Sequence, residues 1–184
     1  VRAIAELSGV RPHVSHYHGP ANMLIDLIDR LRRDGVDITF DSYPYTHGSS
    51  ILAMVALPGA LQAEGPAATL RQLADPHTRA SLNRDWFATR SAELARVRLS
   101  YVASTEFAWS EGLSLPDAAE RASRSIGDFV CAVLLAAELT VGCVFRQPPT
   151  NTDADVRALL KHEAHMAGSD GIFLGSKPHP RGWA

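Results

Sequence analysis

The sequence has little cysteine, no excess of basic residues and no long apolar run. Its 18 lysines and arginines are outnumbered by 20 acidic residues, which gives a net charge of −2. No basic surface therefore favours nucleic acid, and no polybasic tract favours anionic lipid. The longest apolar run, 129–137, falls well short of the ~20 residues that a membrane span needs. We expect neither a nucleic acid nor a membrane as a partner.

The two cysteines, Cys131 and Cys143, are too few for a disulfide framework. Each lies in an apolar run, which is typical of a buried small hydrophobic residue. The residues that follow Val1 do not have the n-region and h-region pattern of a secretory leader. Because it begins Val-Arg-Ala-Ile without a methionine, we expect that its natural beginning lies upstream. A cytoplasmic location is the working expectation.

With 184 residues and 46% hydrophobic content, the chain has the size of one ordinary domain. Residues 12–16 and 36–40 have strand patterns. Between them, apolar side chains spaced three and four apart predict a helix that begins after Gly19-Pro20 and ends at Gly35. Strand, helix and strand within about thirty residues indicate a parallel βαβ unit.

The rest of the chain continues the alternation of strands and helices, with no internal repeat. We expect further helices over 114–122, 127–138 and 152–161, and further strands over 97–102, 140–145 and 165–167. The class is α/β, and the pattern alone does not distinguish an open sheet from part of a (β/α)₈ barrel. Polar stretches follow several strands, at the edge where parallel α/β proteins build active sites.

Asp170 is the first candidate for chemistry, because it lies between glycines directly after the predicted strand 165–167. It can be a metal ligand, a general base or a helix N-cap. The N-cap role is disfavoured because 171–175 is a poor helix start. Beside a metal-activated water, a carboxylate is well placed to take a proton and later pass it to a leaving amine. Arg181 follows eleven residues later, and the chain could bring it back over the site that contains Asp170.

His16 and His18 are the second candidate, at the end of the strand 12–16. In an extended segment, residues two apart point the same way, so the two rings offer nitrogen ligands on one face. Neutral imidazole suits Zn²⁺, and a catalytic zinc takes about three protein ligands. The alternative is a polar, exposed strand end without a metal.

The other histidines and the tyrosines carry weaker signals. His162 and His165 are three residues apart, whereas the helical zinc-protease motif needs them four apart on one helix face. His77 and His179 are expected in turns. The tyrosines around Pro44, Tyr43 and Tyr45, are expected to pack at a rigid bend, with hydroxyls that can reach a ligand.

Taken together and in order, several motifs resemble the N-acyl-D-amino-acid deacylases (D-aminoacylases) of the amidohydrolase superfamily. The resemblance covers nearly the whole chain. It is carried by four segments: Val14-Ser15-His16 with Gly19-Pro20-Ala21-Asn22, then Thr39-Phe40-Asp41-Ser42-Tyr43-Pro44-Tyr45-Thr46, then Gly168-Ser169-Asp170-Gly171, and last Pro178-His179-Pro180-Arg181.

This resemblance implies a zinc-bearing (β/α)₈ barrel, of which residues 1–184 would be the C-terminal half, about strands five to eight. The N-terminal half and a small β-sandwich would be missing. His16 matches the zinc-binding histidine after strand five, and Asp170 matches the strand-eight aspartate that binds metal and serves as general acid and base. Arg181 matches the arginine whose planar fork grips the substrate α-carboxylate.

The chain departs from the family pattern at three points. The early His-x-His pair and the bridging ligand of the superfamily would lie upstream of Val1. His18 occupies a position where the family has a lysine-like residue. His47 stands where members commonly carry alanine, and we assign it to the strand-six ligand, with Tyr45 as a further substrate contact. The alternative is that His47 is particular to this chain and that fewer groups from this half hold the zinc.

The implied reaction is zinc-dependent hydrolysis of an N-acyl-D-amino acid to a D-amino acid and a carboxylate. Two alternatives remain open. One is a hydantoinase- or dihydroorotase-like enzyme that acts on cyclic amides, and the other is a catalytically inactive fragment. Because half a barrel leaves strand edges unpaired, we expect this chain alone to form homo-oligomers, aggregate or be inactive.

Overall fold

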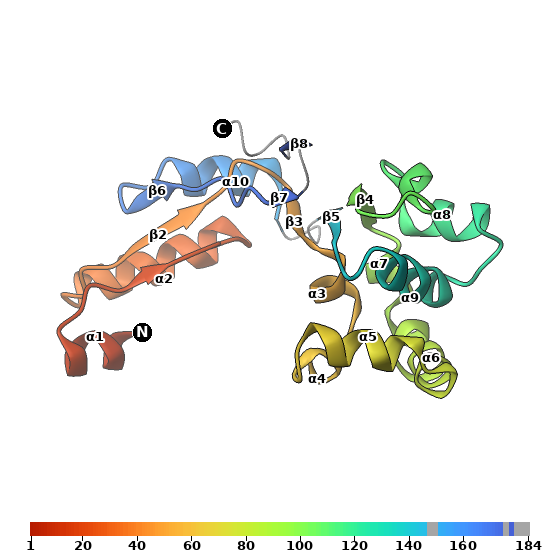
Figure 1. Cartoon of the computed structure of the whole chain (residues 1–184). Coiled ribbons are helices and arrows are strands. Elements are labelled where there is room, and N and C mark those ends of the chain that lie inside the picture. Colours follow the sequence, from red (N-terminus) through yellow and green to blue (C-terminus); the bar gives the residue numbers. More distant parts are fainter. Residues whose placement is uncertain (147–150, 175–176, 179–184) are drawn as a thin grey trace. The chain divides into compact units, whose positions relative to one another are not determined.

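The computed structural model describes residues 1–146, 151–174 and 177–178. The chain divides into two compact units (Figure 1). The first contains the described residues of 1–48 and 151–171, and the second contains 49–146 with 172–174 and 177–178. Each unit has its own hydrophobic core.

The first unit is built on a parallel sheet of three short strands. These are β1 (His13–Val14), β2 (Thr39–Ser42) and β6 (His165–Ala167), in the order β1-β2-β6. Helix α2 (Ala21–Arg33) connects β1 to β2, and α10 (Asp153–Leu160) precedes β6 (Figure 1). The predicted βαβ unit is therefore confirmed. A further helix, α1 (Arg2–Ser8), ends at Gly9 in the left-handed conformation.

Along β2, buried and less buried residues alternate, because successive side chains of a strand point to opposite faces of the sheet. Phe40 is fully buried in a core with Ile28 of α2 and Leu159 of α10. The other face of β2 carries Thr39 and Asp41, which are only partly buried. The helices thus cover one face of the sheet, and the opposite face carries polar side chains.

The register places the carboxyl ends of the three strands at one edge. Val14 pairs with Phe40, and Phe40 pairs with His165. The segments that begin at Ser15, Tyr43 and Gly168 therefore leave the sheet side by side. The polar stretches predicted to follow strands are brought together in this way for residues 15–18, 41–45 and 168–170.

The second unit is largely helical and packs around α9 (Ile126–Ala136), whose Phe129, Val133 and Leu134 are fully buried. Its sheet has the order β3-β5-β4. The strands are β3 (His47–Ile51, whose first two residues belong to the first unit), β4 (Val97–Val102) and β5 (Val141–Arg146), with a short antiparallel pair, β7 (Phe173–Leu174) and β8 (Lys177–Pro178). The other helices are α3 (Leu52–Ala56), α4 (Gly59–Gln62), α5 (Pro66–Ala74), α6 (Pro76–Leu82), η1 (Asn83–Phe87), η2 (Ala88–Arg90), α7 (Ser91–Leu94), η3 (Ala108–Ser110) and α8 (Leu115–Arg121).

Strands β4 and β5 pair antiparallel with each other, which the alternation of strands and helices did not indicate. A local sequence pattern identifies a strand but not its partner, so 97–102 and 140–145 were predicted as strands without their pairing. In the described residues the parallel sheet consequently has three adjacent strands, where the resemblance implied about four. The strand before Asp170 pairs directly with β2.

Both cysteines are buried in the second unit and are not disulfide-bonded, as predicted. None of the described helices is both long and apolar enough to cross a membrane.

Candidate active site at the carboxyl edge of the parallel sheet

His16 and Asp170 meet at the carboxyl edge of the parallel sheet. The Nε2 atom of His16 lies 3.4 Å from Oδ1 of Asp170. One residue follows β1 and the other follows β6, so the fold brings together side chains that are 154 positions apart in the sequence. The His16 side chain is 57% exposed and that of Asp170 is 21% exposed, so the pair is open to solvent on the histidine side.

Both residues have a left-handed backbone, with φ of +56° at His16 and +48° at Asp170. Such a conformation is uncommon for residues other than glycine and costs about 1–3 kcal/mol. No helix follows Asp170, because the next element is β7. The N-cap alternative for Asp170 is therefore excluded, and the surrounding fold holds both residues in a strained conformation.

Asp41, at the end of β2, is the centre of a hydrogen-bond network beside this pair. Its Oδ1 accepts the backbone N–H of His16 at 3.0 Å. Its Oδ2 accepts the hydroxyl of Ser15 at 2.8 Å and lies 2.9 Å from Nε2 of His13. The other ring nitrogen of His13 lies 2.8 Å from the hydroxyl of Thr39. Strands β1 and β2 are thus tied together by side chains as well as by their backbones.

These contacts keep the Asp41 carboxylate charged. Burial on its own would raise the pKa of Asp41, but hydrogen bonds from the His16 backbone, His13 and Ser15, together with the charge of His13, lower that pKa to about 2. At neutral pH the site therefore contains a fixed negative charge next to the backbone of His16.

Aromatic rings lie beside the histidines. The ring of His18 packs on Tyr43 with centroids 3.9 Å apart, and Tyr43 stacks on Tyr45 at 6.1 Å. The ring of His16 meets the edge of Tyr43 at 6.2 Å. The prediction that His16 and His18 share one face assumed an extended segment, and that assumption was wrong. Strand β1 ends at Val14, and the backbone of His16 is left-handed.

His162 and His165 have structural partners, in agreement with their failure to match the protease motif. The His162 ring accepts the N–H of Ala164 on Nδ1 and donates from Nε2 to Asp29 of α2 at 3.0 Å. The Nε2 atom of His165 lies 3.0 Å from the hydroxyl of Ser42. Each histidine therefore connects neighbouring elements of the first unit.

His47 begins β3, is exposed, and has its Nδ1 atom 3.5 Å from the Thr46 hydroxyl. Across the described residues, no three His, Cys, Asp or Glu side chains are grouped so that they could hold a metal. The structure thus brings His16 and Asp170 together but does not add His47 to them. Arg181 and His179 lie outside the described residues.

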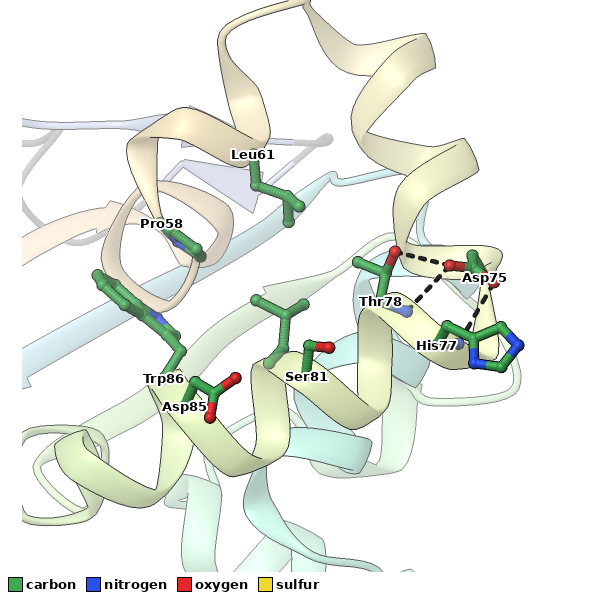
Figure 2. Close-up of a pocket in the computed structure, with 9 residues that line it drawn as sticks. Pro58, Leu61, Asp75, His77, Thr78, Ser81, Asp85 and Trp86 are labelled. Carbon is green, nitrogen blue, oxygen red and sulfur yellow. Dashed lines mark hydrogen bonds between the residues drawn. The ribbon is translucent and has the colours of Figure 1, made fainter.

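The second unit has an open pocket of about 490 Å³ between the segment 58–61 and helix α6 with η1 (Figure 2). Most of its polar side chains already make hydrogen bonds within the protein. Asp75 accepts hydrogen bonds from the Thr78 hydroxyl and from the N–H groups of His77 and Thr78, and so caps α6. His77, expected in a turn, lies in the first turn of that helix.

His13, Ser15 and Asp41 also belong to the site, and the sequence did not predict this role for them. Each lies in a segment with a predicted strand or motif. A parallel register between 13–15 and 39–41 would have placed Ser15 opposite Asp41 and His13 opposite Thr39. Polar residues at alternate positions of two adjacent strands were the available signal.

The parallel βαβ sheet, with a histidine and an aspartate at its carboxyl edge, has the fold of part of a (β/α)₈ barrel. Comparisons with known proteins confirm this prediction of fold class. They also confirm the resemblance to D-aminoacylases. No protein-family model matches the chain.

The particular relatives are deacylases. The chain is 26% identical over 192 residues to an N-acyl-D-glutamate deacylase from Alcaligenes xylosoxydans xylosoxydans, all of this chain and 30% of that protein being covered. Its fold is similar to that of N-acyl-D-glutamate deacylase from Bordetella bronchiseptica, solved with zinc and a phosphonate inhibitor that mimics the tetrahedral intermediate. That likeness has a TM-score of 0.62 and 24% identity over 99% of this chain and 31% of the other. The likeness to a D-aminoacylase structure has a TM-score of 0.57 and 20% sequence identity, and it covers 99% of this chain and 30% of the D-aminoacylase. The chain thus spans about 30% of the length of its relatives.

Proposed function

We propose that the complete protein is a zinc-dependent amidohydrolase that removes the acyl group from N-acyl-D-amino acids, and that residues 1–184 supply part of its barrel. The observation that carries the proposal is the 3.4 Å approach of His16 to Asp170 at the carboxyl edge of the sheet. The similarity to N-acyl-D-glutamate deacylases over the whole chain supports the choice of reaction.

The two side chains are suited to zinc in chemistry and in spacing. Imidazole nitrogen and carboxylate oxygen are both zinc donors, each about 2.0–2.2 Å from the metal. Two such donors on a tetrahedral ion lie about 3.3–3.6 Å apart, and the measured separation of 3.4 Å is within that range. Further ligands would come from other parts of the complete protein, and His47 is a further candidate within this chain.

When bound, zinc supplies a Lewis-acidic centre that polarises the amide carbonyl and makes water a better nucleophile at neutral pH. Asp170 would then take the proton of the attacking water and return it to the amine that leaves, a use of one carboxylate as both base and acid. Its left-handed backbone lifts the carboxylate out of the strand direction and toward His16.

Two more residues would hold the substrate. Arg181 offers the planar pair of donors that fits an α-carboxylate, and Tyr45 offers a hydroxyl from the segment after β2. Tyr45 stacks on Tyr43, which in turn contacts the His16 ring. An acyl or side-chain group bound against these rings would therefore lie close to the reacting amide.

The test uses the full-length protein, with N-acetyl-D-glutamate and its L-enantiomer as substrates. We expect hydrolysis of the D-form and about one zinc per chain. Replacing Asp170 by alanine should lower turnover by at least about 10²-fold, as expected for the loss of a general acid and base, and should leave the circular dichroism spectrum unchanged. Unchanged turnover in this variant, or equal hydrolysis of both enantiomers, contradicts the proposal.

A further inference from the structure

Asp41 contacts the segment that carries His16 at three consecutive residues. Its side chain accepts the Ser15 hydroxyl and the His16 backbone N–H, and its own carbonyl oxygen accepts the N–H of Tyr17 at 2.9 Å. His13 pairs with the same carboxylate from inside β1. One residue of β2 therefore fixes the path of the chain on both sides of His16.

The backbone of His16 lies beyond the end of its strand, and the Asp41 carboxylate accepts its N–H. The strand ends at Val14, two residues earlier. His16 has a left-handed backbone with φ of +56°, and its side chain is 57% exposed, so burial does not fix it. A residue in a sparsely populated conformation persists only where its surroundings determine it. Here the hydrogen bond from the His16 N–H to the Asp41 carboxylate holds the backbone of His16 in this conformation.

Asp41 also lies against the third strand. A Cβ atom built on Gly168 would come within 3.2 Å of Asp41 Oδ1. The Asp41 carboxylate thus sits between the segment that carries His16 and the start of the loop that carries Asp170.

From these contacts we infer that Asp41 is a positioning residue, which holds the His16 imidazole at its distance from Asp170 and does so through the backbone. The inference rests on the proposed function, since it assigns Asp41 a role in arranging the proposed metal site. Asp41 itself touches neither metal nor substrate in this account. Partners of metal ligands typically change metal affinity or activity by about 10–100-fold when they are replaced.

The substitution Asp41→Ala removes every side-chain acceptor, whereas Asp41→Asn keeps one carbonyl oxygen that can still accept the His16 N–H. Asp75→Asn is a matched control. The Asp75 side chain also accepts backbone N–H groups and a hydroxyl, but it caps α6 in the second unit. All three variants are made in the full-length protein.

Two measurements are made, the zinc affinity by competition with a chelator and the hydrogen exchange of individual amides in the metal-free protein. In the parent we expect the His16 amide to exchange at least about tenfold slower than in an unstructured peptide, because a hydrogen-bonded amide must open before it exchanges. In Asp41→Ala the protection of His16 should vanish and the zinc affinity fall by about 10–100-fold. Asp41→Asn and Asp75→Asn should stay within about threefold of the parent in both measurements, since a retained hydrogen bond keeps the positioning.

Tyr17 provides an internal control, because its N–H bonds to the Asp41 backbone and should stay protected in Asp41→Ala. The inference is overturned if the His16 amide is unprotected in the parent, a result that needs no variant to fold. It is also overturned if Asp41→Ala binds zinc as tightly as the parent, or if Asp41→Asn loses as much affinity as Asp41→Ala. A parent that binds no zinc contradicts the proposed function instead, and the exchange of the His16 amide still decides whether Asp41 holds that segment.

Discussion

Gly168 and Asp41 are so close that a side chain at position 168 would press on the carboxylate. A Cβ atom at Gly168 would lie 3.2 Å from Oδ1 and 3.4 Å from Cγ of Asp41. These distances are shorter than ordinary contacts between a methyl group and its neighbours. The glycine at the start of the Gly-Ser-Asp-Gly motif is thus explained by the close approach of β6 to the end of β2.

We predict that Gly168→Ala moves the Asp41 carboxylate by a few tenths of an ångström and weakens its bond to His16. The free energy of unfolding should fall by about 1 kcal/mol, at the lower end of the cost of overpacking, and the zinc affinity of the full-length protein should fall as well. Urea unfolding and a chelator competition measure the two effects.

Gly59→Ala serves as the control for this substitution, because a Cβ atom there would meet nothing within 4 Å. Gly59 lies at the start of α4, in the second unit. Its variant should keep the stability and the zinc affinity of the parent. An equal loss of zinc affinity in both variants would show that the effect at Gly168 does not depend on Asp41.

His162 is predicted to matter for stability and not for metal binding. Its ring makes two hydrogen bonds, to the Ala164 N–H and to Asp29, and packs on Phe40 with centroids 5.5 Å apart. We expect His162→Ala to lower the free energy of unfolding by about 2 kcal/mol, because it leaves a backbone N–H without its acceptor. Zinc stoichiometry should be unchanged, and a loss of metal at constant folding would contradict this role.

The two thiols should be unreactive in the native protein. Burial raises the pKa of Cys131 to about 11 and that of Cys143 to about 12. At pH 8 a thiol-specific reagent should therefore label neither cysteine until urea unfolds the chain, since the thiolate is the reactive form. Rapid labelling of the folded protein would contradict the burial of these residues.

The raised pKa values of Cys131 and Cys143 should lower the stability of the protein at high pH. Thiols of the unfolded chain ionise near pH 8.5, whereas the buried ones stay protonated up to about pH 11 and 12. The contribution of these groups to stability is complete below pH 8.5 or so and is lost as the pH rises through that interval. Denaturant unfolding at pH 8 and pH 10 measures the decrease, and Cys143→Ala should reduce it.

Arg181 is predicted to bind the substrate carboxylate in the full-length enzyme. Arg181→Ala should raise KM for an N-acyl-D-amino acid much more than for the corresponding amide, because the amide offers no charge to the guanidinium. Steady-state kinetics on the two substrates gives the comparison, with Arg84→Ala as a control, since Arg84 bonds only its neighbour Asp85 among the described residues. An equal rise for both substrates would refute a carboxylate contact.

Much of the fold could be predicted from local sequence patterns. The spacing of Leu24 and Ile28 predicted α2, and both residues are buried against the sheet. Thr152 and Asp155 form the capping box that begins α10, within the segment predicted to be helical. Hydrophobic periodicity and capping act over a few residues, so a single sequence is enough to reveal them.

The pairing of strands and the hydrogen-bond network around Asp41 could not be predicted from local sequence patterns. Val97–Val102 has the alternating pattern of a strand and Val141–Arg146 is mostly apolar, and neither pattern indicates that the two strands pair antiparallel. His16 and Asp170 were proposed as partners on motif resemblance, but Asp41 was not, because its role comes from lying opposite Ser15 and under Gly168. Such a role depends on register, which is a property of the folded sheet.

The central claim is that His16 and Asp170 bind one zinc ion between them. The most direct measurement is an anomalous difference map from a crystal of the full-length protein grown with zinc. The claim predicts a peak within about 2.0–2.2 Å of both His16 Nε2 and an Asp170 carboxylate oxygen. Zinc bound at other residues, with His16 and Asp170 paired only with each other, would contradict it.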